Sequence, residues 1–331
     1  MANSTYDTLD NLMRGEVIGK KAPGAKRSRS GYASISLVVK KAPEVMVKIT
    51  GNGKGAAHAG AHLEYITRNG KLELEDENGD LIIGKKEVKA LLKEWMENRG
   101  KAKENTRDTT HIILSMPKGV KKDDVRNGAR GFAKKQFGLN HQYAFALHDD
   151  TDNPHVHLVV RNLGFDNKRL HVKKGDPQKW RETFASELNK VGVNASATHR
   201  TVRGVIKKGT KQAVYQIRKD ENRIANTDIS KKVEAAKEYQ GKYKPSKPWE
   251  KKISERQTHV RKTWLQASRD LAKSSSIEDK ELSKDILEFV KDMPPMKTER
   301  HTLLEAVKAL HQQQKQPQNQ NTKENTNAPD R

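Results

Sequence analysis

The sequence predicts an α+β fold in which helices pack on an antiparallel sheet, followed by a mainly helical, basic C-terminal region. Two runs with alternating apolar residues, 142–148 and 155–161, flank a short polar turn and predict a hairpin. Apolar residues at helical spacing occur before and after it, at 86–99, 121–137 and 177–191. Strand, helix, hairpin and helix in that order are typical of helices packed on one face of an antiparallel sheet.

The first part of the chain predicts an arm, a strand and a short helix. Residues 1–30 are polar and rich in Lys and Arg, which predicts a flexible basic arm. Two short apolar runs follow at 34–39 and 45–49, and we expect the glycine-rich segment 51–55 to end the second of them as a strand. A short helix is then expected at His58–Arg68.

The layer itself is predicted between residues 86 and 191. A helix at 86–99 and a strand at Asp108–Ser115 precede a basic amphipathic helix at Lys121–Phe137. The hairpin follows, and a helix at Pro177–Val191 completes a domain predicted at residues 31–205.

The chain changes character towards its C-terminus. Residues 200–262 contain 19 Lys and Arg against 7 Asp and Glu, with few large aliphatic side chains. We expect a basic, mainly helical region at 206–311, whose last helical pattern is interrupted by Pro294 and Pro295. The Gln/Asn-rich residues 312–331 predict a disordered tail.

The charge of the chain points to a polyanionic partner. Lys and Arg number 65 against 42 Asp and Glu, a net charge of +23, which fits nucleic acid. A solvated basic surface and attraction to anionic lipid are the alternatives. We expect neither membrane insertion nor export, because long apolar runs and a signal-like N-terminus are missing. The absence of cysteine excludes disulfides and thiolate chemistry and fits a reducing cytosol.

The run HDDTDNPHVH at residues 148–157 carries the most specific chemical signal. Side chains two apart on a strand share a face, so His155 and His157 lie together. If residues 149–154 form the hairpin turn, His148 joins them. An H-x-H pair alone is more often an ordinary polar pair, but three imidazoles with open positions are typical of a catalytic metal site. Carboxylates of the acidic turn are candidate acceptors for the ring N–H groups.

Tyr65 is the candidate nucleophile on this basic protein. Leu63 and Ile66 would anchor its short helix to a core. Arg68, three residues on, would place a phosphate-binding cation beside the phenol. Taken alone, the local sequence favours a tyrosine packed at a helix edge, so the hypothesis depends on the other motifs.

Together these motifs resemble the P-type conjugative relaxases, plasmid mobilisation nucleases that include the T-DNA border nickase, within the HUH endonuclease superfamily. The matches are LEYITR around Tyr65, ILSMP with Ser115, and H-x-D-x-x-x-P-H-x-H at 148–157. A stretch at 194–204 also resembles the end of the nuclease domain. The resemblance covers roughly residues 45–205, and the preceding residues are an extension of undefined role.

The resemblance implies nicking of one DNA strand at a plasmid or integrative-element transfer origin, for conjugative mobilisation. Tyr65 would attack the phosphodiester, leaving a 3′-hydroxyl and a 5′-phosphotyrosine link that later rejoins the strand. His148, His155 and His157 would hold Mg²⁺ or Mn²⁺, although imidazole alone suits zinc, nickel, cobalt or manganese better than magnesium. Asp150 would orient a ligand histidine or help accept the tyrosine proton, its alternative being a plain turn aspartate.

Basic segments are expected to contact the DNA. The candidate DNA-binding residues are Arg68, Ser115, Lys122, Arg126, Arg130, Arg161, Arg200 and Arg203. Ser115 is associated with DNA recognition only through the resemblance, and a strand-end hydroxyl is its alternative. Phosphate contacts should make binding weaken steeply with salt.

The resemblance also implies partners and a location. The partners are single-stranded and supercoiled DNA at the transfer origin, a relaxosome accessory protein, a coupling ATPase and the type IV secretion channel. The location is the bacterial cytoplasm, with transfer of the DNA-linked protein to a recipient cell. The sequence of residues 206–331 does not specify which of these partners it serves.

Three other functions compete with a tyrosine nickase. A rolling-circle initiator or transposase of the same superfamily is disfavoured, because Tyr65 precedes the histidines here. A metal-dependent nuclease that uses water, without a covalent intermediate, is one alternative, and a non-catalytic DNA-binding relaxosome component is the other.

His58 and His62 form a weaker candidate metal pair, and His111 has no preferred role.

Overall fold

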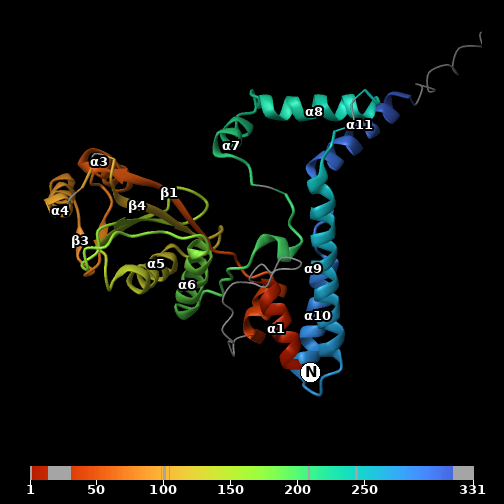
Figure 1. The fold of residues 1–331 in the computed structure, drawn as a ribbon, viewed down its shortest axis with the longest axis horizontal. Helices are drawn as coiled ribbons and strands as arrows, with labels where there is room; N and C mark the ends of the chain where they lie inside the picture. Colours follow the sequence, from red (N-terminus) through yellow and green to blue (C-terminus); the bar gives the residue numbers. More distant parts are fainter. Residues whose placement is uncertain are drawn as a thin grey trace, which may run out of the picture. The chain divides into compact units, whose positions relative to one another are not determined.

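The computed structural model describes residues 2–13, 31–97, 99, 102–103, 105–207, 209–242 and 245–315. The chain divides into two compact units, a sheet unit at Arg27–Thr198 and a helical unit formed by Met1–Lys26 with His199–Arg331. Figure 1 shows the strands in the first and the long helices in the second. The predicted α+β fold with a helical C-terminal region is confirmed. Among the described residues, none of the helices combines the length and apolar character needed to cross a bilayer.

Six antiparallel strands form the sheet, in the order β1-β4-β6-β5-β2-β3. They are β1 (Met46–Lys54), β2 (Leu74–Asp76), β3 (Leu81–Ile82), β4 (Arg107–Ser115), β5 (Tyr143–His148) and β6 (His155–Arg161). The predicted hairpin is β5–β6, and it pairs His148 directly with His155. Strands β2 and β3 were not predicted, because two or three residues are too few to show an alternation.

One face of the sheet carries the main core, under helices α5 (Lys122–Phe137) and α6 (Asp176–Lys190). Tyr143 and Phe145 of β5 are buried there together with Phe132 of α5, as their alternation predicts. Leu158 of β6 lies on the same side. The opposite face is therefore left for the histidines.

That second face is covered by α3 (Gly55–Ile66), with α4 (Lys85–Glu97) packed beside it. Leu63 and Ile66 of α3 are fully buried against Ala144, Ala146 and Val159 of the sheet. The small alanine side chains thus make room for a helix.

Strand β1 runs through the glycine-rich segment, so the prediction that residues 51–55 end the strand is wrong. A Cβ at Gly53 would lie 2.3 Å from Thr109 Oγ1 and 3.1 Å from the backbone of Ala59, so only glycine allows α3 to approach the sheet so closely. The chain then turns at Gly55, where φ is 68°, and the helix begins there rather than at His58.

The helical unit contains α1 (Ala2–Met13), the 3₁₀ turn η1 (Arg200–Arg203), α7 (Gln212–Lys219), α8 (Asn226–Tyr239), α9 (Pro248–Ala272), α10 (Ile277–Lys291) and α11 (Glu299–Lys315). Its core lies between α9 and α10, where the rings of Trp264 and Phe289 meet edge to face at 5.2 Å. The break between α10 and α11 falls at Pro294 and Pro295, as predicted. One further helix, α2 (Gly31–Val39), belongs by its contacts to the other unit.

Two predictions about the ends of the chain are corrected. The prediction of a flexible arm at 1–30 is wrong for Ala2–Met13, which form α1. This helix packs against α9 because Leu9 and Leu12, three residues apart, are both buried. The rest of that arm lies outside the described residues. The disordered tail does not begin at Gln312, since α11 continues to Lys315, and residues 316–331 lie outside the described part.

Candidate metal and tyrosine site

The hairpin register brings three histidines together at one end of β5 and β6. His148 pairs with His155, and His157 stands opposite Ala146. The ring centroids are 4.4 Å apart for His148 and His157, 5.3 Å for His148 and His155, and 5.2 Å for His155 and His157. One potential ligand nitrogen from each ring lies within 4.8 Å of the others. The predicted convergence is confirmed, and metal binding at it stays a prediction.

Burial favours the neutral form of His148 and His157. It lowers the pKa of His157 to about 3, with a further lowering from His148 and His155. The pKa of His148 is lowered as well, again mainly by burial. A neutral ring offers a lone pair without competition from protons, which is the state that a divalent cation needs. The donor set therefore fits such a cation.

Backbone carbonyl groups orient two of the rings. His148 Nε2 donates to the carbonyl oxygen of Ile66 at 2.6 Å, and His155 Nδ1 donates to that of Asn153 at 3.0 Å. Those nitrogens carry the proton, so Nδ1 of His148 and Nε2 of His155 keep lone pairs for a ligand. The prediction that carboxylates of the acidic turn accept from the ring N–H groups is wrong for these two nitrogens.

Tyr65 stands over the histidines from the end of α3. Its side chain is 57% exposed, although Leu63 and Ile66 on either side are fully buried. Its ring centroid lies 5.8 Å from that of His157 and 6.4 Å from that of His148. Because the His148 bond ends on Ile66, one hydrogen bond links a ligand ring to the helix that carries the phenol. The structure thus brings the predicted nucleophile to the predicted metal ligands.

Arg68 is beside Tyr65 for a reason that the sequence did not show. The helix ends at Ile66, and Arg68 has a φ of 51°, outside helical geometry. Its guanidinium carbon lies 6.0 Å from the centre of the Tyr65 ring. The same guanidinium forms an ion pair with Asp150. That contact gives the Asp150 carboxylate a cationic partner rather than the expected histidine.

Two further histidines complete this face: His62, predicted with His58 as a weaker candidate metal pair, and His111, which had no preferred role. His62 of α3 and His111 of β4 stack with centroids 3.5 Å apart and planes 6° apart. The His62 ring lies 6.1 Å from Tyr65 and 6.3 Å from His157. Burial lowers the pKa of His62 to about 4 and that of His111 to about 3. The one available signal was the position of His62, a helical turn before Tyr65.

The cations predicted to bind DNA occupy different settings. Lys122 is exposed and pairs with Asp149 of the acidic turn at 2.8 Å, and Arg126 pairs with Asp123 at 2.9 Å. Arg130 instead binds the buried carboxylate of Glu75 through two nitrogens, a fixed structural contact. Its predicted role in phosphate binding finds no support in this geometry.

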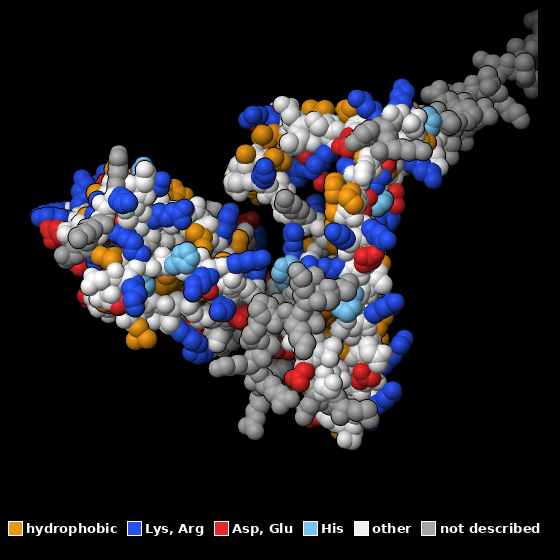
Figure 2. Space-filling model, viewed as in Figure 1, with side chains coloured by type: hydrophobic (Ala, Val, Ile, Leu, Met, Phe, Trp, Pro, Cys, Tyr) orange, Lys and Arg blue, Asp and Glu red, His pale blue; other side chains and the backbone are white. Residues whose placement is uncertain are grey.

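The remaining DNA-binding candidates lie away from open solvent or in the other unit. Ser115 is buried, with its hydroxyl 3.4 Å from the carbonyl oxygen of Pro154. Arg161 donates to Gln142 at 2.5 Å. Arg200 and Arg203 belong to η1 of the helical unit, where Arg200 donates to the carbonyl oxygen of Lys207. On the face that Figure 2 shows, Lys and Arg are spread over both units rather than gathered in one patch.

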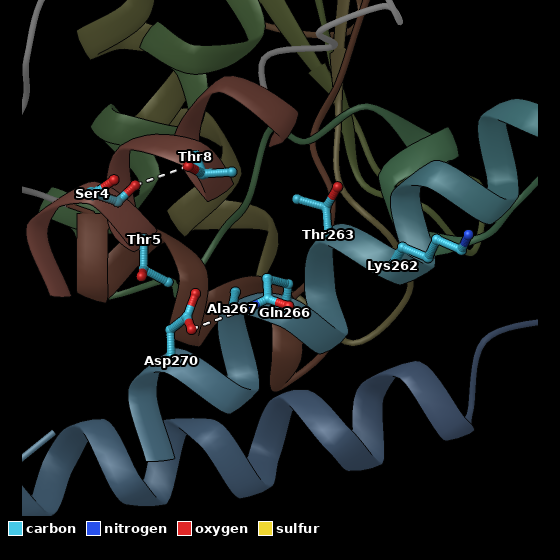
Figure 3. A pocket seen from close by; sticks show the side chains of 8 residues that line it. All are labelled: Ser4, Thr5, Thr8, Lys262, Thr263, Gln266, Ala267 and Asp270. Atoms are coloured by element: carbon cyan, nitrogen blue, oxygen red, sulfur yellow. Dashed lines mark hydrogen bonds between the residues drawn. The ribbon is translucent and has the colours of Figure 1, made fainter. Parts of the chain in front are cut away.

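A separate cavity of about 360 Å³ lies in the helical unit, along α1 and α9. Figure 3 shows its lining of small hydroxyls with Lys262 and Asp270 at its edges. Thr8 donates to the carbonyl oxygen of Ser4, and Gln266 donates to Asp270. These groups satisfy one another, and the cavity contains none of the candidate catalytic residues.

Part of the sheet unit is similar to a known family of nuclease domains. Residues 65–192 match the family model "Relaxase: MobA/VirD2-like, nuclease domain". The "T-DNA border endonuclease VirD2" of Rhizobium radiobacter is 29% identical over 162 residues, which is 43% of this chain and 38% of that protein. The protein of the same name from Agrobacterium fabrum is 27% identical over 173 residues, 46% of this chain and 39% of that protein. The chain thus spans about two fifths of the length of these relatives.

One solved structure is also similar, though weakly. It is described as "Molecular Basis of Vancomycin Resistance Transfer in Staphylococcus aureus" and is 16% identical, covering 48% of this chain and 99% of its own. The TM-score is 0.33.

Proposed function

We propose that the sheet unit is a relaxase nuclease domain of the MobA/VirD2-like type and that the protein nicks one strand of DNA at a transfer origin. The observation that carries the proposal is the position of Tyr65, an exposed phenol beside the clustered imidazoles of His148 and His157. A tyrosine that only packed at a helix edge would not need metal-binding or phosphate-binding side chains near its hydroxyl. Here a phosphate could contact the phenol, Arg68 and the histidines together.

The reaction is a transesterification. The Tyr65 oxygen forms a bond to phosphorus, the bond from phosphorus to the 3′ oxygen breaks, and the phenolic proton is replaced by the phosphoryl group. The departing 3′ oxygen takes up a proton, so a 3′-hydroxyl and a 5′-phosphotyrosine result. The reverse reaction rejoins the strand without ATP, because the covalent link conserves the bond energy.

The residues of the site divide this work. A divalent cation, Mg²⁺ or Mn²⁺, held by His148, His155 and His157 would neutralise charge on the phosphate. Arg68 would bind a non-bridging oxygen once DNA replaces Asp150 as its partner. Exposed lysines such as Lys122 would contact flanking phosphates.

The same premise extends to conjugative mobilisation. We propose the origin DNA as substrate, and an accessory protein, a coupling ATPase and a type IV secretion channel as partners of the helical unit. The support is the family likeness of the nuclease domain alone, and no residue of the helical unit is assigned to a partner.

The test is a denaturing gel after incubation with a randomised single-stranded DNA pool and Mn²⁺ or Mg²⁺, with and without EDTA. We expect a covalent protein–DNA adduct that disappears with EDTA and in Tyr65→Phe. Tyr215→Phe is the matched control, since Tyr215 is 52% exposed but lies on α7 of the helical unit. Cleavage without an adduct would show a hydrolytic nuclease, and DNA binding without cleavage would show a binding module. Either result overturns the proposal.

A further inference from the structure

Helix α3 covers only part of the histidine face of the sheet. The helix packs against the Gly53 end of β1 and against β4, and its buried residues share a cluster with Ala144, Ala146 and Val159 of β5 and β6. At the opposite end of β1, the same face continues from the histidines over β4 to the edge of the sheet. There Met46 is 45% exposed and Lys48 is exposed. The open area therefore begins at the edge strand, since between it and the histidines Ser115 is buried and Ile113 is half-buried.

The strand register places these two side chains on the histidine face. Met46 pairs with Ser115, which pairs with His155. Lys48 pairs with Ile113, which pairs with His157. Directly opposed residues of antiparallel strands point to the same side. Since neighbouring strands lie about 4.8 Å apart, Met46 and Lys48 stand roughly 10 Å from the two histidines.

The chemistry of this open area suits a single strand of nucleic acid. In the two rows that lead from β1 to β6, none of the side chains is acidic, one is a lysine, and Met46 and Ile113 are apolar. A phosphate needs the ammonium group, and the face of a base covers apolar side chains without regard to sequence. The area is also continuous with the site where the scissile phosphate would bind.

We propose that Met46 and Lys48, with Ile113 between them and the histidines, form a subsite for the nucleotides next to the scissile phosphate. Lys48 binds a phosphate of the strand, and Met46 with Ile113 contacts a base. This inference rests on the proposed nuclease function and adds the path of the substrate. A lysine on an edge strand also hinders pairing with other strands, but that role alone would not affect DNA.

The first test compares Lys48→Ala with Lys54→Ala. Lys54 is exposed on the same strand, at its other end, and has Asn105 as partner, so both variants lose one charge of β1. We expect Lys48→Ala to weaken binding of a single-stranded oligonucleotide by about fivefold, or 1 kcal/mol. The slope of log affinity against log salt should fall by about 0.7, the value for one single-strand phosphate. The adduct rate at saturating DNA should stay unchanged.

Equal effects of the two lysine variants would overturn the subsite, since they would show only a change in overall charge. A fall in the saturated rate with unchanged affinity would overturn it too.

The second test uses the absence of cysteine from the chain, which makes an introduced thiol unique. Met46→Cys is combined with Tyr65→Phe, so that the DNA remains uncut. Oligonucleotides selected for tight binding carry a tethered thiol at successive positions. We expect a disulfide with Met46→Cys at one or two adjacent positions only. Leu139→Cys is the control, because Leu139 is 95% exposed in the same unit but lies outside the strands.

Cross-linking that is absent, or equal at both cysteines, would overturn the subsite. Because this measurement needs no cleavage, its failure is distinguishable from failure of the nuclease. An adduct formed by the unmodified chain, together with no specific disulfide at position 46, rejects the subsite and leaves the proposed function in place.

Discussion

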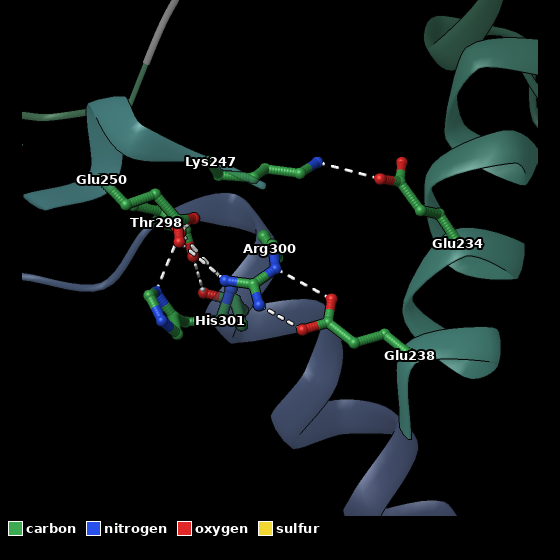
Figure 4. Close-up of polar contacts among 8 residues, drawn as sticks. Glu234, Glu238, Lys247, Glu250, Thr298, Arg300 and His301 are labelled. Carbon is green, nitrogen blue, oxygen red and sulfur yellow. Dashed lines mark hydrogen bonds and ion pairs between the residues drawn. The ribbon is translucent and has the colours of Figure 1, made fainter. Parts of the chain in front are cut away.

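The histidine face of the sheet unit and the junction of α8, α9 and α11 in the helical unit both gather polar side chains from several elements. At the junction the charges satisfy one another. Figure 4 shows Arg300 of α11 between Glu238 of α8 and Glu250 of α9, and Lys247 bound to Glu234. On the histidine face, burial instead holds bases in their neutral form, and His62 Nε2 has no hydrogen-bond partner among the described residues.

The difference indicates a structural role for the junction and a chemical role for the histidine face. Opposite charges that pair bidentately fix the helices in place and leave nothing for a ligand. Clustered neutral bases stabilise the fold little, because desolvation costs free energy that hydrogen bonds within the cluster do not return. A bound cation or phosphate would supply the missing partner. The comparison therefore predicts that changes on the histidine face alter chemistry and that changes at the junction alter stability.

The largest expected effect follows removal of a ligand ring. His155→Ala should lower adduct formation by roughly 100- to 1000-fold, the range for loss of a charge-stabilising group in a transition state. Affinity for single-stranded DNA should change less than about twofold, because it comes mainly from phosphate contacts elsewhere. His171→Ala, an exposed histidine of the same unit, is the control in gel and anisotropy assays. An equal loss of binding and cleavage in His155→Ala would break the division between chemistry and affinity.

The next effect concerns pH and the stability of the sheet unit without metal. His62, His111 and His157 have folded pKa values of about 4, 3 and 3, below the value of about 6.5 in an unfolded chain. The unfolded state therefore binds more protons, so their contribution is present above pH 6.5 and is lost as the pH falls towards 3. Hydrogen exchange should show falling protection of β4 and β6 over this range.

Peptides of α9 and α10 serve as the internal control in that experiment. Parallel losses in the two units would mean that the imidazoles are not the cause. In His111→Phe, which keeps a ring against His62, the pH dependence should be shallower than in the unmodified chain.

A smaller effect is expected at the junction. Arg300→Ala removes both carboxylate contacts and should destabilise the pairing of α8 and α11 by about 1–2 kcal/mol, a partly buried charged pair being stronger than a surface one. Protection of α8 against hydrogen exchange measures this loss. Arg269→Ala, an exposed arginine near the end of α9, is the control. Adduct formation should be unchanged in both variants, and a loss in Arg300→Ala would show that the two regions are coupled.

On the histidine face, some features could be predicted from the sequence and others could not, for physical reasons. The period of two on β5 and β6 forces His148, His155 and His157 onto one face, so the triad was predictable. The partner of His62 was not, because His111 reaches it only through the packing of α3 on β4, which leaves no local pattern. The predicted start of α3 was wrong for the same reason. Position 53 requires glycine because of its contact with Thr109, which is distant in the sequence.

In the helical unit, a mainly helical region at 206–311 and the break at Pro294 were predicted, but the limits of the single helices were not. Helix α1 was missed because a polar composition masked Leu9 and Leu12. The junction of Arg300 with two glutamates could not be predicted, because ion pairs between helices depend on how the helices pack.

The smallest expected effect concerns Asp150, within the candidate site itself. Asp150 is half exposed and forms an ion pair with Arg68. It therefore resembles the ion pairs of the helical junction, although it lies at the edge of the histidine face. If it serves only to hold that cation, Asp150→Asn frees Arg68 and removes a repulsive charge, and DNA binding rises about two- to threefold, as for a weak exposed pair. If instead it accepts the proton of Tyr65, the adduct rate at saturating DNA falls by about 100-fold or more. Measuring affinity and saturated rate separately, with Asp152→Asn as the control for one lost charge of the same turn, decides between them. The ion pair in the structure favours the first outcome, because the Asp150 carboxylate already accepts a hydrogen bond from Arg68.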